Sequence, residues 1–225
     1  EFMRLQAEHF YPAEFIHHLF FVLAMQLSAG SEELRDLLRF MVDDIKRAPR
    51  LTGDKILWVH LMPYYQQSLK AAFDYSPAHQ IVAVDMAFCT MSDLTDADPF
   101  RALAKKLIDN AMNGPYERKL ALVDRLLDAT HADGVIHFCH WGCKQSAGGS
   151  ALLREHLHEA GVPLLQLDGD GIDERNSHDG QIKTRLEAFF EVLEAKRAEG
   201  GAQGGSVNGE STAQGGTAET KGGAR

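Results

Sequence analysis

Four short apolar runs, separated by longer helix-like segments, constrain the fold of this chain most strongly. They are ILWVHL (56–61), QIVAVDM (80–86), GVIHFC (134–139) and VPLLQLDGD (162–170). Each run is short and rich in Val, Ile or Leu, which is typical of a strand buried on both faces. Strands that alternate with helices are joined by crossovers, and crossovers produce a parallel sheet covered on both sides. The pattern therefore predicts an open, doubly wound α/β domain of the flavodoxin-like type, with about four strands.

Helical segments fill the intervals between these strands. The expected helices cover 63–74, 99–112, 115–130, 146–161 and 180–197. Residues 1–50 precede the first strand, and their apolar residues recur at helical spacing, so we expect a helical N-terminal element there. Ser31 is expected to cap a helix within this element, and Asp98 with Pro99 to open the helix at 99–112.

The composition of the chain changes near Ala198. Residues 198–225 are rich in Gly, Ala, Ser, Thr and Gln, and Val207 is their only large aliphatic residue. Such a segment buries too little apolar surface to offset the entropy lost on ordering. We therefore predict three parts: a helical element at 1–50, a flavodoxin-like domain at 51–197 and a disordered tail at 198–225.

The charge balance excludes several classes of partner. The 225 residues include 23 Lys and Arg against 32 Asp and Glu, which gives a formal net charge of −9 at pH 7. So acidic a chain lacks the basic surface that nucleic-acid binding needs and is repelled by anionic lipids. No apolar run reaches the roughly 20 residues of a membrane span, and no signal-peptide pattern opens the sequence. We expect a cytoplasmic protein with no nucleic-acid or membrane partner.

Thiol, imidazole and carboxylate groups gather where the predicted strands end. They are His60, the segment from Asp85 to Cys89, the segment from Cys139 to Cys143, Asp168 and Asp170. Open parallel sheets bind ligands beyond the carboxyl ends of their strands. We therefore expect the functional site at this edge of the sheet.

The segment HFCHWGCKQSAGGS (137–150) is the densest group of reactive residues. Cys143 comes just before a predicted helix, where backbone N–H groups favour a thiolate, and thiolates bind soft metals and iron–sulfur clusters. Cys139 lies inside the strand pattern and is explained equally well as a small buried hydrophobe. Zinc is a weaker alternative, because the usual paired-cysteine spacing is absent. The turn SAGGS (146–150) fits either an anion cradle or close packing of a helix.

Two further features lie near the expected edge. Cys89 is a second thiol there, and we expect it to line the wall of the site rather than to bind a cluster. Arg185, near the start of the last helix, is explained by an ion pair with Glu187 or with a neighbouring loop.

Three segments carry a family resemblance. They are DGVIHFCHWGCKQ (133–145), GVPLLQLDGDGID (161–173) and QIKTRLEAFFEVL (181–193), in that order. The run Q-x-x-T-R-x-E-A-F, which begins at Gln181, is the most specific part. The sequence resembles the C-terminal half of a 2-hydroxyacyl-CoA dehydratase D-component subunit, a family related to benzoyl-CoA reductase subunits, over about residues 1–195.

The resemblance implies a cofactor and partners. Such subunits pair as heterodimers, hold a [4Fe-4S] cluster through cysteines, and receive an electron from a separate ATP-dependent activator protein. The reduced enzyme converts an (R)-2-hydroxyacyl-CoA to a 2-enoyl-CoA through a ketyl radical. The family's C-terminal cluster cysteine corresponds to Cys143 better than to Cys139 or Cys89. Around the cluster or the CoA substrate we expect His140, Lys144, Gln145, Ser146, Gln181, Thr184 and Arg185.

The sequence departs from the family pattern in one respect. Family subunits contain two flavodoxin-like domains, whereas this sequence predicts one, so further cluster cysteines must come from elsewhere. We expect a hydro-lyase subunit that is inactive alone. Two alternatives stay open: a binding or assembly module without a cofactor, including an inactive family member, and a subunit of the benzoyl-CoA reductase type.

Overall fold

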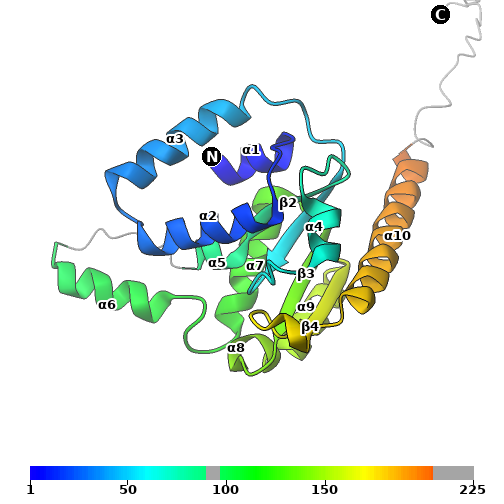
Figure 1. Cartoon of the computed structure of the whole chain (residues 1–225). Coiled ribbons are helices and arrows are strands. Elements are labelled where there is room, and N and C mark those ends of the chain that lie inside the picture. Colours follow the sequence, from blue (N-terminus) through cyan, green and yellow to red (C-terminus); the bar gives the residue numbers. More distant parts are fainter. Residues whose placement is uncertain (90–96, 205–225) are drawn as a thin grey trace, which may run out of the picture. The chain divides into compact units, whose positions relative to one another are not determined.

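The computed structural model describes residues 1–89 and 97–204. Its described strands form one parallel sheet in the order β2-β1-β3-β4, which confirms the predicted α/β class (Figure 1). The strands are β1 (Asp54–Val59), β2 (His79–Val84), β3 (Gly134–His140) and β4 (Leu164–Gly169). Because all the pairings are parallel, the carboxyl ends of the strands lie at one edge of the sheet, as predicted.

Helices precede and separate the strands. They are α1 (Phe2–Glu8), α2 (Phe15–Leu27), α3 (Glu32–Ile45), α4 (Gln67–Phe73), α5 (Asp85–Phe88), α6 (Pro99–Asp109), α7 (Glu117–Thr130), α8 (Lys144–Ala147), α9 (Ser150–Glu159) and α10 (Asp179–Gly204). The first three confirm the helical N-terminal element. The predicted caps are also present, because Ser31 accepts a hydrogen bond from the Leu34 N–H and Asp98 accepts from the Phe100 and Arg101 N–H groups.

Several predicted elements differ from the observed ones. The second strand, expected to run to Met86, ends at Val84, and Asp85 begins the short helix α5. The helix expected at 99–112 ends at Asp109. The helix expected at 63–74 begins only at Gln67. The helix expected at 146–161 is two helices, α8 and α9, separated at Gly148 and Gly149. The last helix continues past 197 to Gly204, and 205–225, the rest of the predicted tail, lie outside the described residues.

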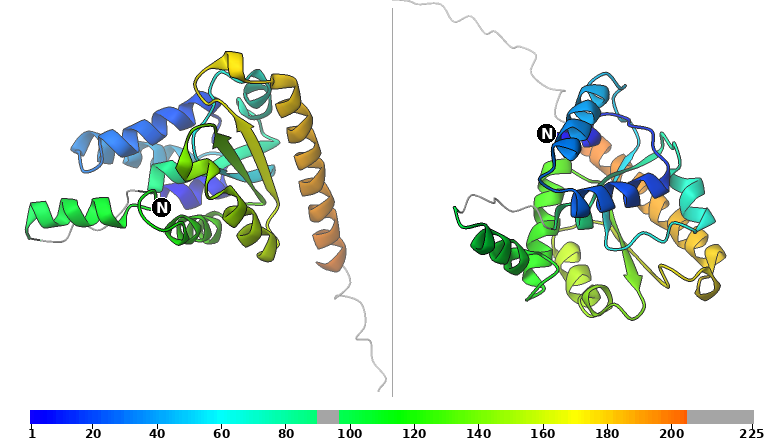
Figure 2. Two further views of the ribbon diagram at one scale, coloured as in Figure 1. Left: turned by 90° about the horizontal axis from the view of Figure 1, so that it is seen from below. Right: turned by 60° about the vertical axis from the view of Figure 1, so that its left-hand side comes forward.

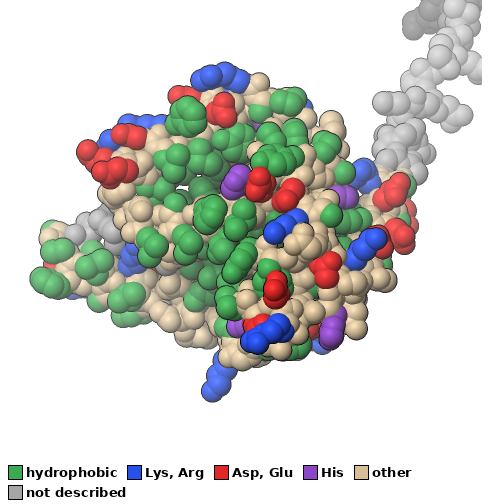
Figure 3. Space-filling model, in the orientation of Figure 1, with side chains coloured by type: hydrophobic (Ala, Val, Ile, Leu, Met, Phe, Trp, Pro, Cys, Tyr) green, Lys and Arg blue, Asp and Glu red, His purple; other side chains and the backbone are tan. Residues whose placement is uncertain are grey.

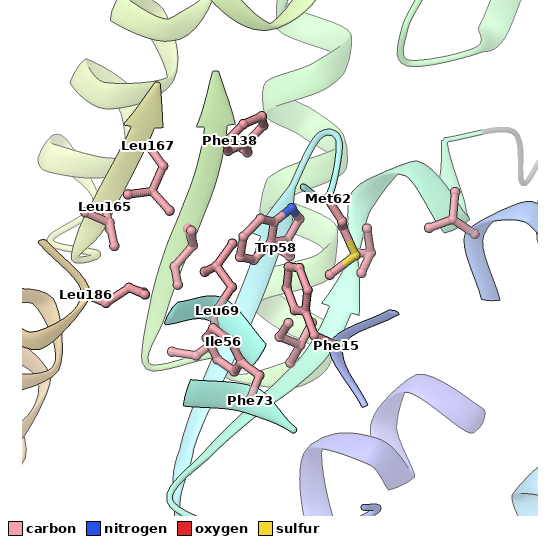
Figure 4. Close-up of a cluster of buried hydrophobic side chains, with 14 of the residues drawn as sticks. Phe15, Ile56, Trp58, Met62, Leu69, Phe73, Phe138, Leu165, Leu167 and Leu186 are labelled. Atoms are coloured by element: carbon pink, nitrogen blue, oxygen red, sulfur yellow. The ribbon is translucent and has the colours of Figure 1, made fainter. Parts of the chain in front are cut away.

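The sheet is covered on both faces by apolar side chains. Ile56 and Trp58 point to one face, where they pack with residues of α2, α4 and α10 (Figure 4). Leu57 and Val59, the alternate residues of β1, point to the other face and pack with α7 and α9. This two-sided core explains why residues 56–59 of β1 and 81–84 of β2 are apolar without interruption. At the edge of the sheet, β4 carries Gln166 and the exposed Asp168.

Contacts divide the chain into two units. Residues 1–193 form a compact unit that contains the whole sheet, and Glu194–Arg225 form a second unit whose described part is helical to Gly204. In the part of the chain that the structure describes, no helix is both long enough and apolar enough to span a bilayer.

Helix α6 stands apart from the sheet. It extends away from the other elements in the left view of Figure 2. Its apolar residues Phe100, Leu103, Leu107 and Ile108 are exposed, Phe100 by 83%. Hydrophobic side chains also gather over α2, where Phe20, Leu23 and Leu27 are exposed (Figure 3).

Candidate functional site

A tight turn after β3 places Cys143 at the carboxyl edge of the sheet. The Cys143 N–H donates to the His140 carbonyl over 3.2 Å, and Gly142 lies in the left-handed region with φ +77°. That backbone conformation favours glycine. The Cys143 side chain is half-buried, whereas the other two cysteines are buried. Cys143 is therefore the thiol best placed to meet a ligand.

His60 stands beside this thiol. It follows β1 directly, and its Nε2 lies 3.4 Å from Cys143 Sγ. Its backbone has φ +77°, which is uncommon for a residue with a Cβ, and its side chain is only 7% exposed. The edge of the sheet thus brings together two residues that are far apart in the sequence.

A fully buried ion pair lies behind His60. Lys119 of α7 contacts the carboxylate of Asp85, and both side chains have essentially no solvent exposure. The other carboxylate oxygen, Asp85 Oδ1, accepts a hydrogen bond of 2.7 Å from the His60 backbone N–H. Lys119 also points Nζ toward the Met112 sulfur at 3.5 Å. Charges so deeply buried persist only when they are paired.

Two buried histidines share this environment. Burial, together with the Lys119 ammonium, lowers the pKa of His60 to about 4. Burial, with Lys119 again, lowers the pKa of His137 in β3 to about 4. His60 Nδ1 and His137 Nε2 are buried without a hydrogen-bond partner among the described residues. Both imidazoles are therefore neutral at physiological pH.

The folded chain should lose stability when it is acidified. The unfolded chain binds a proton at His137 below pH 6.5, whereas the folded chain binds it only near pH 4. Keeping His137 neutral therefore contributes to the free energy of unfolding in full above pH 6.5. This contribution is lost as the pH falls to 4, a decrease of about 3 kcal/mol.

Urea unfolding of wild type and His137→Leu between pH 4 and 7 measures this decrease. The variant should show the flatter profile and the exposed His158→Leu control should not; parallel profiles for wild type and His137→Leu would refute the assignment.

The other two thiols lie away from the exposed edge. Cys139 Sγ faces the Ser146 carbonyl at 3.7 Å, and burial raises the pKa of this thiol. Cys89 is held by Gln26, whose Nε2 donates to its sulfur over 3.3 Å, and burial raises its pKa as well. Both sulfurs thus make hydrogen-bond contacts inside the protein.

The residues expected around Cys143 have different surroundings. Ser146 is buried and donates to the His140 and Cys143 carbonyls, so it closes the turn. Gln145 donates to the Ala111 carbonyl over 3.4 Å, and Lys144 is exposed. His140 Nδ1 accepts a hydrogen bond of 2.9 Å from the Gly171 N–H, which ties the turn to the loop after β4.

The expected residues of the last helix lie at a separate cleft. Gln181 and Arg185 line a small cleft of about 190 Å³ together with Trp141, Asp168 and Asn176. Arg185 pairs with Asp168 of β4 at 3.7 Å and not with Glu187, and both partners are solvent-accessible. Thr184 donates to the Gly180 carbonyl within its own helix.

The glycines of the SAGGS turn serve packing. A Cβ on Gly149 would collide with the Tyr116 ring, and one on Gly148 would collide with the Lys144 carbonyl. Close approach of α9 to the start of α7 therefore requires glycine at position 149. These contacts agree with the packing explanation of the turn.

Sequence reasoning missed Lys119. Its neighbours in α7 are Glu117 and Arg118, so the local pattern predicts an exposed position. The available signal was Asp85, a carboxylate directly after an apolar strand, which needs a partner if it is buried.

The described residues could provide one ligand of an iron–sulfur cluster. Within ranges 1–89 and 97–204, no group of three or more His, Cys, Asp or Glu side chains could hold a metal ion. Cubane clusters need several thiolates, and Cys143 is the only half-exposed one described. A cavity of about 880 Å³, lined mostly by α3 with Phe2 of α1 and Met25 of α2, has no His or Cys in its lining and lies outside this site.

Open parallel α/β sheets bind ligands and cofactors beyond the carboxyl ends of their strands, and the half-buried thiol of Cys143 lies at that edge here. This chain belongs to the family described as 2-hydroxyglutaryl-CoA dehydratase, D-component, which it matches over residues 1–193. The family resemblance is thereby confirmed.

Two curated relatives support the family assignment. The chain is 24% identical over 180 residues to the (R)-phenyllactyl-CoA dehydratase alpha subunit of Clostridium sporogenes, covering 75% of this chain and 43% of that protein. It is 26% identical over 102 residues to a benzoyl-CoA reductase subunit of Thauera aromatica, covering 45% of this chain and 24% of that protein. The matches thus span less than half the length of either relative.

Proposed function

We propose that this chain is a subunit of an iron–sulfur 2-hydroxyacyl-CoA dehydratase and that Cys143 is one ligand of its [4Fe-4S] cluster. The observation that carries the proposal is the position of Cys143, half-buried at the carboxyl edge of the sheet in a chain of the dehydratase family. The remaining thiolates come from elsewhere in the complex. We therefore expect the chain alone to be inactive.

The chain's own residues would position the ligand and exclude water from one side of it. The turn from His140 to Cys143 fixes the thiol, and His60, which directly follows β1, contacts the sulfur. When bound, the cluster would supply one electron at low potential to a 2-hydroxyacyl thioester, as ketyl-type dehydration to a 2-enoyl-CoA requires. Gln181 and Arg185 line a separate cleft, which suits a polar part of the CoA substrate.

The proposed complex has two protein partners: a paired subunit and an ATP-dependent activator that delivers the electron. Both curated relatives are named as subunits, which supports the first of these. The exposed apolar residues of α6 also support it, because a contiguous apolar face on a projecting helix is typical of a protein interface.

Substitution on α6 should weaken subunit association. We expect Phe100→Ser with Leu107→Ser to raise the Kd for the paired subunit at least tenfold, at about 1.4 kcal/mol per tenfold. Because both side chains are exposed, stability should change by no more than about 0.5 kcal/mol. Val192→Ser, an exposed apolar residue of α10, is the matched control. Sedimentation of the purified complex gives the Kd, and equal values for both variants would refute a role for α6.

Anaerobic co-expression with the other dehydratase subunits tests the proposal. We expect a brown complex that contains iron and, with the activator and ATP, dehydrates an (R)-2-hydroxyacyl-CoA. A stable complex without iron would instead support a cofactor-free assembly module.

A subunit of the benzoyl-CoA reductase type is the second candidate. It is favoured by the match to the Thauera aromatica reductase. Activity on benzoyl-CoA, without dehydration of 2-hydroxyacyl-CoA, would select it.

A further inference from the structure

The geometry around His60 joins two features that the proposed function leaves unexplained: an unusual backbone conformation and a fully buried ion pair. His60 has φ +77°, and such a conformation costs on the order of 1–3 kcal/mol unless its surroundings hold it. Asp85 Oδ1 accepts from the His60 N–H at 2.7 Å, a charge-assisted hydrogen bond. The strained residue is therefore anchored to the buried carboxylate.

The Asp85 carboxylate, which holds His60, is itself held by Lys119 of a third element, α7. Asp85 begins α5 after β2, Lys119 belongs to α7, and His60 follows β1. Lys119 compensates the Asp85 charge, which has no access to water. The position of the His60 N–H thus depends on α5 and α7 as well as on β1. The side chain of His60 in turn contacts Cys143.

We propose that His60 is a positioning residue for Cys143, donating its Nε2–H to the cysteine sulfur, and that Asp85, neutralised by Lys119, holds His60 in place. The inference rests on the proposed function, because it assigns His60 a role toward a metal-bound sulfur. A metal-bound thiolate has no proton to donate, so across the 3.4 Å contact Nε2 must carry the hydrogen. Hydrogen bonds to cluster sulfurs tune reduction potential and orient the ligand.

The arrangement of polar atoms agrees with this proton position. His60 Nδ1 is buried and has no partner among the described residues. With the hydrogen on Nε2, the unpartnered atom is an acceptor, and the N–H donor is satisfied by sulfur. With the hydrogen on Nδ1, a buried N–H would have no acceptor, which is the rarer and costlier state.

The first test uses the full chain without iron. The chain is labelled with ¹⁵N-histidine and given one equivalent of methylmercury, which binds one thiol and displaces its proton. We expect the long-range ¹⁵N–¹H spectrum to show the His60 proton on Nε2, with a mercury-dependent shift that is lost in Cys143→Ser and kept in Cys139→Ser. His60→Asn assigns the signal. A proton on Nδ1, or a shift that survives Cys143→Ser, would overturn the proposal.

The second test separates the hydrogen bond from the charge. Asp85→Asn/Lys119→Met and Asp85→Leu/Lys119→Met both remove the ion pair, but only the first keeps an acceptor for the His60 N–H. We expect the mercury-dependent His60 shift to persist in the first and to be lost in the second. The same result in both variants would overturn the role of Asp85. The first test depends on neither double variant folding. Because no iron is used, failure in either test counts against positioning by His60, whereas the iron analysis tests the proposed function separately.

Discussion

Replacing Lys119 by methionine is expected to lower the free energy of unfolding by about 3 to 5 kcal/mol. Methionine is unbranched and only one heavy atom shorter than lysine, so the cavity left behind is small. The cost arises because Asp85, which has no solvent exposure, would be left as a buried charge without its partner. A change of this size exceeds the effect of most single substitutions.

Urea unfolding measures this loss. The matched control is Lys183→Met, because Lys183 is exposed and its pairing with Glu187 is worth little. Asp85→Asn/Lys119→Met should recover most of the stability, since neither charge is then stranded. If Lys119→Met cost no more than Lys183→Met, the buried pair would not exist in solution.

Replacing Cys143 by serine is expected to lower the iron content of the anaerobically purified complex at least about tenfold, and its brown colour with it. Serine keeps the size of the side chain but removes the thiolate. Cys139→Ser is the matched control, because Cys139 lies close by in sequence and its sulfur is buried against the Ser146 carbonyl. Iron analysis and visible absorption measure the effect. Loss of iron in Cys139→Ser but not in Cys143→Ser would reverse the assignment.

The class of fold was predictable from local pattern. Short apolar runs that alternate with helical segments, such as GVIHFC at 134–139, are typical of buried parallel strands, and β3 spans Gly134–His140. Caps were predictable for the same reason, because Ser31 and Asp98 act on N–H groups within three residues. Interactions between residues that are close in the sequence can be predicted from the local sequence alone.

The strand order and the surroundings of Cys143 were not predictable in this way. The 3.4 Å contact between His60 and Cys143 depends on β1 and β3 being neighbours. The burial of Lys119 depends on Asp85, which lies in another element. The break between α8 and α9 was within reach, because two adjacent glycines, Gly148 and Gly149, are a local signal against one continuous helix.

Anomalous diffraction at the iron edge, from crystals of the anaerobically purified complex, would locate the cluster relative to Cys143. We expect an iron peak within bonding distance of Cys143 Sγ, at the carboxyl edge of the sheet and beside His60. Iron bound elsewhere, with the Cys143 sulfur free, would contradict the proposal.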